Sequence, residues 1–322
     1  MQLAEALKEG LVDGIPKPER HIETWLSDIF LYEDVGRKVT KHVSDEAVGD
    51  FVDPLKRKNF YRADFAWNNL FAPEIYTSLE GMREINGGWK PSEHNTADDF
   101  FILMNRIDAD DTLINRLWNK KVTKEDVVRI TEKLLINLDR ANEKYFDEQN
   151  RELGKSVYER MIARLSNFRD FARSASGISQ EVTDSRANAL VHFHASHPYF
   201  KKLPESSASV TIDGHSANIV FIENKPVFMD VYWPMPAFRI VDHALATARI
   251  AACVRIFGGD ELAGAMYDTY RRKRTLPPKE ILDFYEAYNA FVMGYYFTHI
   301  KRHELIQPYF IFADARLSAL QA

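Results

Sequence analysis

Three oxygen-bearing side chains, Asp213, Asn218 and Asp230, have the types and spacing that could bind a metal ion carrying phosphate. Asn218 follows Asp213 by five residues, and Asp230 comes twelve residues later, at the end of the next apolar run. Mg²⁺ takes oxygen ligands and usually shares them with substrate phosphates. Asn218 and Asp230 would therefore bracket such an ion, while Asp213 would face a substrate hydroxyl and orient it or accept its proton. This division of roles is typical of phosphoryl transfer.

The same residues also allow a simpler interpretation. Asp213-Gly214 fits an ordinary turn, and an Asp followed five residues later by an Asn occurs about once by chance in a chain of this length. The surroundings favour chemistry, because the motif lies between apolar stretches and Asp230 ends the strand that follows.

The elements that would position these side chains follow from periodicity. Expected strands are residues 207–212, 219–223 and 226–232 around the motif, and 25–32, 35–43 and 100–104 further upstream. Residues 90–99 and 176–188 are expected to be irregular. Expected helices are residues 54–71, 109–119, 123–146, 151–174 and 187–197, and then 236–319 with breaks at Gly258-Gly259 and Pro277-Pro278.

This order predicts an α+β fold with two lobes. A small β-rich lobe would span residues 1–105, and a larger, mostly helical lobe with the embedded hairpin would span residues 106–322. Ligands tend to bind in clefts between such lobes. The first lobe is therefore expected to bind nucleotide, and the second to carry the catalytic and metal-binding loop.

Composition excludes several classes of function. The net charge of −5 argues against a nucleic-acid or anionic-membrane binder. The single cysteine, Cys253, rules out an internal disulfide and indicates a reducing compartment. The N-terminal residues lack the basic and apolar regions of a secretion signal, and no run is long and apolar enough to span a bilayer. We therefore expect a cytoplasmic protein; the sequence does not indicate an oligomeric state.

The motif is part of a longer resemblance. Asp213-x-His215-x-x-Asn218-Ile, then Lys-Pro-Val-Phe-Met-Asp230, then Phe-Arg239-Ile-Val-Asp242 resembles the aminoglycoside-phosphotransferase-like kinases. It is most similar to their uncharacterised bacterial branch, which reads H-G-D-L-H-x-x-N-I, F-D and F-R-x-x-D in the same order. Segments 24–31, 51–53, 68–76 and 103–106 are also similar to that branch. The likeness covers about residues 20–117 and 205–250.

The resemblance implies a protein-kinase-like fold, ATP or another nucleoside triphosphate, Mg²⁺, and transfer of phosphate to a small hydroxylated molecule. It assigns the catalytic base to Asp213 and the metal ligands to Asn218 and Asp230. It further implies supporting roles in the active-site loop for His215, Arg239 and Asp242.

The resemblance also implies a phosphate-anchoring lysine within residues 37–41. Lys38 fits the family position and Lys41 is the rival, although either could be a solvated lysine at a strand end. The partner of that lysine would be Asp64, on the helix where the family has Glu, so the ion pair could be longer or missing. Met104 falls on the connector between the lobes, beside the nucleotide.

Several positions depart from the family pattern. Thr211-Ile212 replaces the His-Gly before the catalytic Asp, Trp233 replaces an acidic residue, and Ala246 replaces a second Asp. These departures support an alternative, in which a weak or inactive kinase-like protein binds nucleotide or a protein partner. A purely structural helical scaffold is a third alternative, which requires the motif to be coincidental.

Overall fold

The chain folds into two compact units. The computed structural model describes residues 1–24, 26–45, 49–108, 110–153, 156–203, 207–212, 214–231 and 240–321. The first unit comprises Met1–Ala109 together with Phe228–Trp233, and the second comprises Asp110–Val227 together with Pro234–Ala322. The short segment after residue 227 thus belongs with the first unit, although the chain on either side of it belongs to the second.

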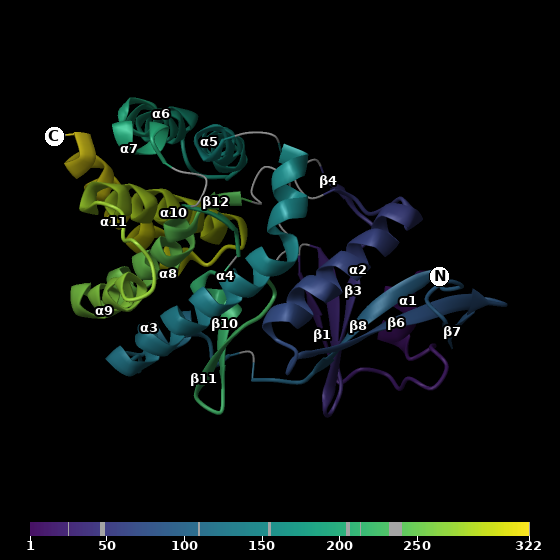
Figure 1. Ribbon diagram of the computed structural model, residues 1–322. Helices are drawn as coiled ribbons and strands as arrows, with labels where there is room; N and C mark the ends of the chain where they lie inside the picture. The colour runs from purple at the N-terminus through teal and green to yellow at the C-terminus, as the bar shows by residue number, and fades with distance from the viewer. Residues whose placement is uncertain are drawn as a thin grey trace. The chain divides into compact units, whose positions relative to one another are not determined.

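The first unit is built on a six-stranded antiparallel sheet in the order β1-β2-β3-β8-β6-β7 (Figure 1). The predicted hairpin of β2 and β3 is confirmed, with Ile29 opposite Lys38, and β3 pairs in turn with β8. The strands are β1 (Arg20–Glu23), β2 (Ser27–Leu31), β3 (Val35–Thr40), β6 (Tyr76–Ile85), β7 (Gly88–Ser92) and β8 (Asp99–Asn105), with a separate short pair, β4 (Ser44–Asp45) and β5 (Gly49–Asp50).

The two faces of this sheet carry different helices, because successive side chains of a strand point to opposite faces. Phe101 packs in a core with Leu3 and Leu7 of α1 (Leu3–Glu9). Its neighbour Phe100 instead contacts Tyr61 of α2 (Pro54–Phe71), with ring centroids 5.8 Å apart. Helix α2 runs along the sheet in Figure 1 and packs on β6 and β8.

The first unit differs from the sequence-based expectation at several points. Strands β1 and β6 were not predicted, and β3 ends at Thr40 rather than at residue 43. Residues 90–99 were expected to form a loop, but Gly88–Ser92 is strand β7, paired with β6 through Ile85 opposite Gly88. The two residues between them, Asn86 and Gly87, have φ angles of 54° and 80°. An Asn-Gly pair in this conformation is the preferred two-residue turn of a β-hairpin, and it was the signal that the sequence interpretation overlooked.

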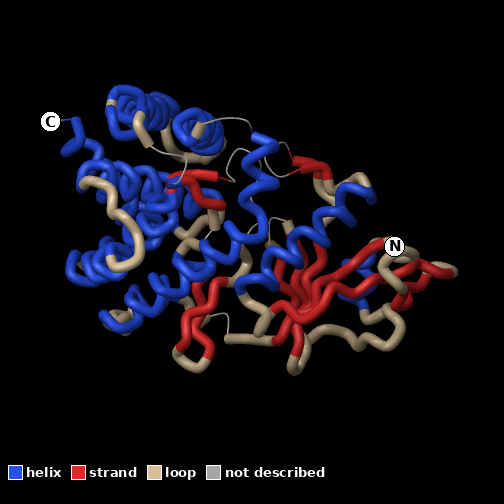
Figure 2. The backbone as a smooth tube through the Cα atoms, viewed as in Figure 1, coloured by secondary structure: helices blue, strands red, loops and turns tan. Residues whose placement is uncertain are grey.

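The second unit is mostly helical, and its helices are drawn in blue in Figure 2. Two short strand pairs accompany the helices, β10 with β11 and β9 with β12. The helices are α3 (Leu113–Trp118), α4 (Lys124–Leu153), α5 (Val157–Arg173), α6 (Gln180–Ser196), α7 (Pro198–Lys201), η2 (Ser216–Asn218), α8 (His243–Gly258), α9 (Asp260–Arg271), α10 (Lys279–His299) and α11 (His303–Gln321), and the strands are β9 (Ala208–Val210), β10 (Ile219–Ile222), β11 (Lys225–Phe228) and β12 (Ile240–Asp242).

Several expectations for the second unit are wrong in detail. Helix α4 continues to Leu153 through the break expected after residue 146, and strand β11 ends at Phe228, before Asp230. Helix α6 begins at Gln180, where irregular chain was expected, because the Ser179 hydroxyl caps it by accepting from the Val182 N–H at 3.2 Å. Ile240–Asp242 is strand β12, paired with β9, rather than helix. Helices α10 and α11 are separated at residues 300–302, where Lys301 has a φ of 58°. The predicted breaks at Gly258-Gly259 and Pro277-Pro278 are confirmed.

None of the helices described combines the length and the apolar character needed to cross a bilayer.

Candidate active site

Lys38 and Asp64 meet inside the first unit. Lys38 lies opposite Ile102 in the pairing of β3 with β8, and its side chain points to the face of the sheet that α2 covers. Its Nζ is 3.3 Å from Oδ2 of Asp64, and the side chains are 11% and 2% exposed. Although Asp is one methylene shorter than the Glu of the kinases that the sequence resembles, the ion pair is present.

Helix α2 places Asp64 at this point. The helix begins with Pro54, and the Asp53 carboxylate caps it by accepting from the backbone N–H groups of Leu55 and Lys56, at 2.8 and 3.0 Å. It ends at Phe71, before Pro73, which cannot continue a helix. Asp64 lies in its third turn, on the buried face.

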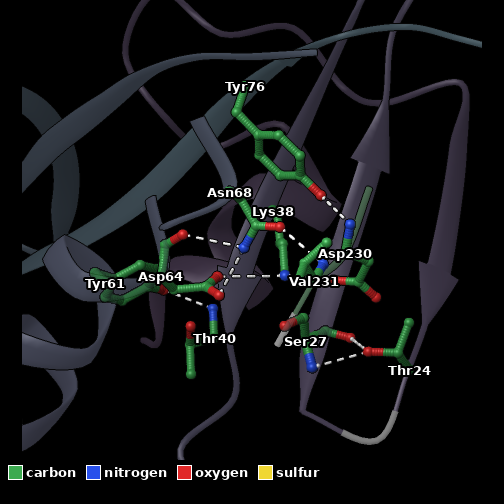
Figure 3. Close-up of polar contacts among 10 residues, drawn as sticks. All are labelled: Thr24, Ser27, Lys38, Thr40, Tyr61, Asp64, Asn68, Tyr76, Asp230 and Val231. Atoms are coloured by element: carbon green, nitrogen blue, oxygen red, sulfur yellow. Dashed lines mark hydrogen bonds and ion pairs between the residues drawn. The ribbon is translucent and has the colours of Figure 1, made fainter. Parts of the chain in front are cut away.

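Asp230, which is 192 positions after Lys38 in the sequence, contacts the same lysine. Its Oδ1 lies 2.8 Å from the Lys38 Nζ, and its side chain is 52% exposed. The backbone of Asp230 has a φ of 47°, in the left-handed region that non-glycine residues seldom adopt. Figure 3 shows Lys38 between the carboxylates of Asp64 and Asp230. All three residues belong to the first unit.

The charges of this group stabilise one another. Burial alone lowers the pKa of Lys38, but the negative charges of Asp230 and Asp64 outweigh burial, and the net pKa lies well above its usual value. Lys38 is therefore an ammonium ion throughout the physiological range. A buried charge needs partners of opposite charge, and the carboxylates of Asp64 and Asp230 supply them.

Burial acts in the opposite direction on the neighbouring acids. Loss of water around Asp64 raises the pKa of its carboxyl; Lys38 opposes this effect and Asp230 adds to it. Burial and then the charge of Asp230 raise the pKa of the Tyr76 hydroxyl far above its usual range. Tyr76 is thus neutral at every pH at which the protein would be studied.

The other two residues expected near the nucleotide are Lys41, which follows the end of β3, and Met104, which lies in β8. The Nζ of Lys41 contacts the carboxylate of Glu23 at the surface. Of the two lysines, it is therefore Lys38 that meets Asp64 and Asp230. Met104 is buried in β8, opposite Gly36 of β3 and Tyr76 of β6.

The second unit holds further residues expected at the site. Asn218 ends the short helix η2, where its N–H donates to the His215 carbonyl at 2.8 Å, and the His215 Nδ1 accepts from the Ala217 N–H at 3.3 Å. Asp242 is buried at the end of β12. Its carboxylate caps α8 through the Ala244 N–H at 2.9 Å and accepts from the hydroxyls of Tyr285 and Tyr199 at 2.8 and 3.2 Å.

Asp213, Trp233 and Arg239 lie outside the described residues. The catalytic role expected of Asp213 and the supporting role expected of Arg239 therefore stay predictions. Arg239 and Asp242 were expected to share a helix; Asp242 lies instead in a strand and at a helix cap.

The described residues contain no group of three or more His, Cys, Asp or Glu side chains arranged to hold a metal. Mg²⁺ does not need one, because it commonly binds one or two carboxylates and completes its shell with phosphate oxygens and water. The half-exposed Asp230 carboxylate, beside a buried ammonium, offers this kind of ligand. The residues present therefore fit a magnesium ion that arrives with a phosphorylated ligand.

Sequence reasoning missed two residues of this group, Asn68 and Tyr76. The Asn68 Oδ1 accepts from the Val231 N–H at 2.9 Å, and the Tyr76 hydroxyl accepts from the Asp230 N–H at 2.7 Å. Both residues fall within segment 68–76, which the resemblance had singled out, but their types alone gave no reason to assign them a contact with Asp230.

Comparison with known proteins finds similarity only at the level of structure. No protein-family model and no curated protein sequence matches the chain. Similar solved structures include the GDP and kanamycin complex of APH(2")-IIia, with a TM-score of 0.55 and 7% identity over 98% of each chain.

Two further similar structures are aminoglycoside phosphotransferases as well. One is a thermostable mutant of APH(4)-Ia in ternary complex with AMP-PNP and hygromycin B, with a TM-score of 0.54 and 10% identity over 97% of this chain and 98% of that one. The other is the gentamicin complex of APH(2")-IIa, with a TM-score of 0.51 and 12% identity over 97% and 94%. The chain therefore has the aminoglycoside-phosphotransferase-like, protein-kinase-like α+β fold that its motifs indicated.

Proposed function

We propose that this protein, with its aminoglycoside-phosphotransferase-like fold, is an ATP-dependent phosphotransferase that acts on a hydroxyl of a small molecule. The observation that carries the proposal is the Lys38 ammonium, buried between the carboxylates of Asp64 and Asp230. Kinases of this general type use such a lysine, fixed by an acid, to bind nucleotide phosphates and a nearby aspartate to hold the metal.

Each residue of the group has a distinct part in this proposal. Lys38 binds and neutralises phosphate oxygens, and Asp64 holds the lysine in place. Asp230 and Asn218 are the residues that would hold Mg²⁺, and the ion would neutralise charge on the phosphates. Lys38 and Asp64 are fixed before any ligand arrives, so little reorganisation is needed when charge develops on the phosphate.

The reaction proposed is direct transfer. The acceptor hydroxyl oxygen forms a bond to the terminal phosphorus of the nucleoside triphosphate. The bond from that phosphorus to the bridging oxygen breaks, and the nucleoside diphosphate is released. Asp213 orients the hydroxyl and accepts its proton. The remaining contribution of the protein is positioning.

The ligands of the similar structures support the class of substrate. One of those structures contains GDP and kanamycin, one contains AMP-PNP and hygromycin B, and one contains gentamicin. We infer that this chain binds a nucleotide and a small hydroxylated acceptor, with the nucleotide-binding lobe in residues 1–105 and the catalytic loop in residues 106–322. Its net charge of −5 and single cysteine support a cytoplasmic enzyme that does not bind nucleic acid.

A second function is favoured by one feature of the chain. Thr211 and a buried Ile212 precede Asp213 where the related kinases have His-Gly. A chain altered at this point could retain the Lys38 group and bind nucleotide without transferring phosphate.

The first experiment measures thermal stabilisation by ATP, GTP and AMP-PNP, each with and without Mg²⁺, because a ligand that binds only the folded state raises its apparent stability. The second measures release of the nucleoside diphosphate with a panel of sugars, amino alcohols and aminoglycosides as acceptors. Lys38→Met should abolish the nucleotide effect, and Lys41→Met is the matched control that should retain it.

The outcomes separate the alternatives. Acceptor-dependent release that Asp213→Asn reduces by at least about a hundredfold supports the enzyme. Stabilisation by nucleotide without acceptor-dependent release, and unchanged in Asp213→Asn, supports the inactive binder. No stabilisation by any nucleotide contradicts both.

A further inference from the structure

The chain immediately after β11 is held to the first unit by two side chains that the proposed reaction does not use. The Asp230 N–H donates to the Tyr76 hydroxyl at 2.7 Å, and the next N–H, of Val231, donates to the Asn68 Oδ1 at 2.9 Å. Tyr76 and Asn68 are 1% and 0% exposed. Two consecutive backbone donors therefore have fixed, buried acceptors, as Figure 3 shows.

Asn68 connects the Asp64 carboxylate to the backbone just after Asp230. Its Nδ2 donates to the Asp64 Oδ1 at 2.9 Å and to the Asp64 carbonyl at 3.0 Å. The opposite orientation of the amide would set its oxygen against a carboxylate and its NH₂ against the Val231 N–H, so the orientation is determined by its neighbours. One turn of α2 thus fixes Lys38 through Asp64 and the Asp230 segment through Asn68.

The backbone of Asp230 needs such support. Its φ of 47° lies in the left-handed region, which Asp tolerates better than most residues but which is still less favourable than the right-handed or extended regions. Contacts from the surroundings therefore help to hold it. In this conformation the carboxylate reaches Lys38 at 2.8 Å. The contacts made by Tyr76 and Asn68 are to the backbone at and just after Asp230, where they oppose relaxation of that angle.

We propose that Asn68 and Tyr76 are positioning residues, which hold Asp230 in its left-handed conformation and so fix its carboxylate beside Lys38. The inference rests on the proposed function for its catalytic consequence, but its structural part concerns the protein without ligand. If Tyr76 loses its hydroxyl or Asn68 its amide, Asp230 should sample other backbone angles, and the effective concentration of its carboxylate at the metal should fall.

The first test uses the ligand-free protein. Hydrogen exchange, followed by mass spectrometry of peptides that contain residues 229–231, should be at least about tenfold faster in Tyr76→Phe and in Asn68→Ala than in the wild type, because a buried N–H loses its acceptor. Tyr61→Phe is the matched control. Its hydroxyl also accepts from a backbone N–H, that of Thr40 at 2.6 Å, but does not contact Asp230. It should leave exchange at residues 229–231 unchanged.

The second test follows Mg²⁺-dependent binding of AMP-PNP by calorimetry. Tyr76→Phe should raise the Mg²⁺ concentration needed for half-maximal binding by about tenfold, the effect of one lost buried hydrogen bond, with little change in binding without Mg²⁺. A role in stability alone would lower the unfolding midpoint of Tyr76→Phe and Tyr61→Phe alike and leave the Mg²⁺ requirement of both unchanged.

Unchanged exchange at residues 229–231 in both Tyr76→Phe and Asn68→Ala would overturn the inference. If the wild type binds nucleotide, an unchanged Mg²⁺ requirement in Tyr76→Phe would overturn it as well. A wild type that binds no nucleotide would overturn the proposed function and, with it, the catalytic role. The exchange experiment would still decide whether the two residues hold the segment. If Asn68→Ala does not fold, Tyr76→Phe alone decides, because it removes a single oxygen.

Discussion

Replacement of Lys38 by methionine tests whether the buried ammonium of Lys38 stabilises the neighbouring carboxylates of Asp64 and Asp230. Methionine keeps most of the length of the side chain and removes its charge. The change leaves the Asp64 carboxylate, 2% exposed, without its cation. Removal of one partner of a buried ion pair costs about 3–5 kcal/mol. Because Asp230 is half exposed and can be solvated, we expect a value near the lower end, about 3 kcal/mol.

The pH dependence of this loss follows from Asp64. Burial already raises the pKa of its carboxyl above the usual value, and Lys38 opposes that rise. Without Lys38 the pKa should rise further. A raised folded-state pKa gives stability that is present below the unfolded pKa and is lost as the pH rises through the folded one. Lys38→Met should therefore be destabilised more at pH 8 than at pH 5.

The assay is urea unfolding at both pH values, followed by circular dichroism and tryptophan fluorescence, with coincident curves required for a two-state fit. Lys38→Met combined with Asp64→Asn is the informative companion, because it removes the uncompensated charge and should recover at least about 1 kcal/mol of the loss. The reasoning would be refuted if the free energy of unfolding of Lys38→Met lay within about 1 kcal/mol of the wild-type value at pH 8, or if the loss were equal at both pH values.

Two other predictions concern the second unit. His194 is buried, its ring nitrogens have no hydrogen-bond partner among the described residues, and burial lowers its pKa to about 4. Because the unfolded histidine takes up its proton first as the pH falls, about 3 kcal/mol of stability should be lost between about pH 6.5 and 4. Urea unfolding should show that this contribution disappears in His194→Phe, and an unchanged slope would count against it. In Gly294→Ala, the new methyl would lie 2.7 Å from Cε1 of Phe310, so overpacking should cost about 1–3 kcal/mol. Gly264→Ala, with no atom within 4 Å, should instead stabilise its helix by up to about 1 kcal/mol, and equal melting temperatures for the two variants would contradict this.

The parts of the fold that the sequence predicted well are those with a strong local period. Helix α2 was predicted with its exact bounds, 54–71, because aromatic side chains recur at helical spacing and prolines mark both ends. The strand pair of β2 and β3 was predicted from two apolar runs joined by a short turn. Strand β12, in contrast, is three residues long and depends on its pairing with β9, thirty residues earlier, which leaves no local signal.

The candidate site divides in the same way. Lys38, Asp64 and Asp230 were named as candidates through their resemblance to family motifs, with Lys41 left as a rival to Lys38. Asn68 and Tyr76 were not, because their contacts join residues 163 and 154 positions apart. An asparagine on a helix and a tyrosine at the start of a strand have many ordinary roles. Only the fold shows that their polar atoms face two consecutive backbone donors.

The most direct test of the account measures AMP-PNP binding by calorimetry, with and without Mg²⁺, in the wild type and in Asp230→Asn. Asp13→Asn is the matched control, since Asp13 is a mostly exposed acid of the same unit, paired only loosely with Lys90 at 3.8 Å. The account predicts that Mg²⁺ tightens binding in the wild type and the control, and that this tightening is lost in Asp230→Asn. Equal enhancement by Mg²⁺ in all three proteins would contradict it.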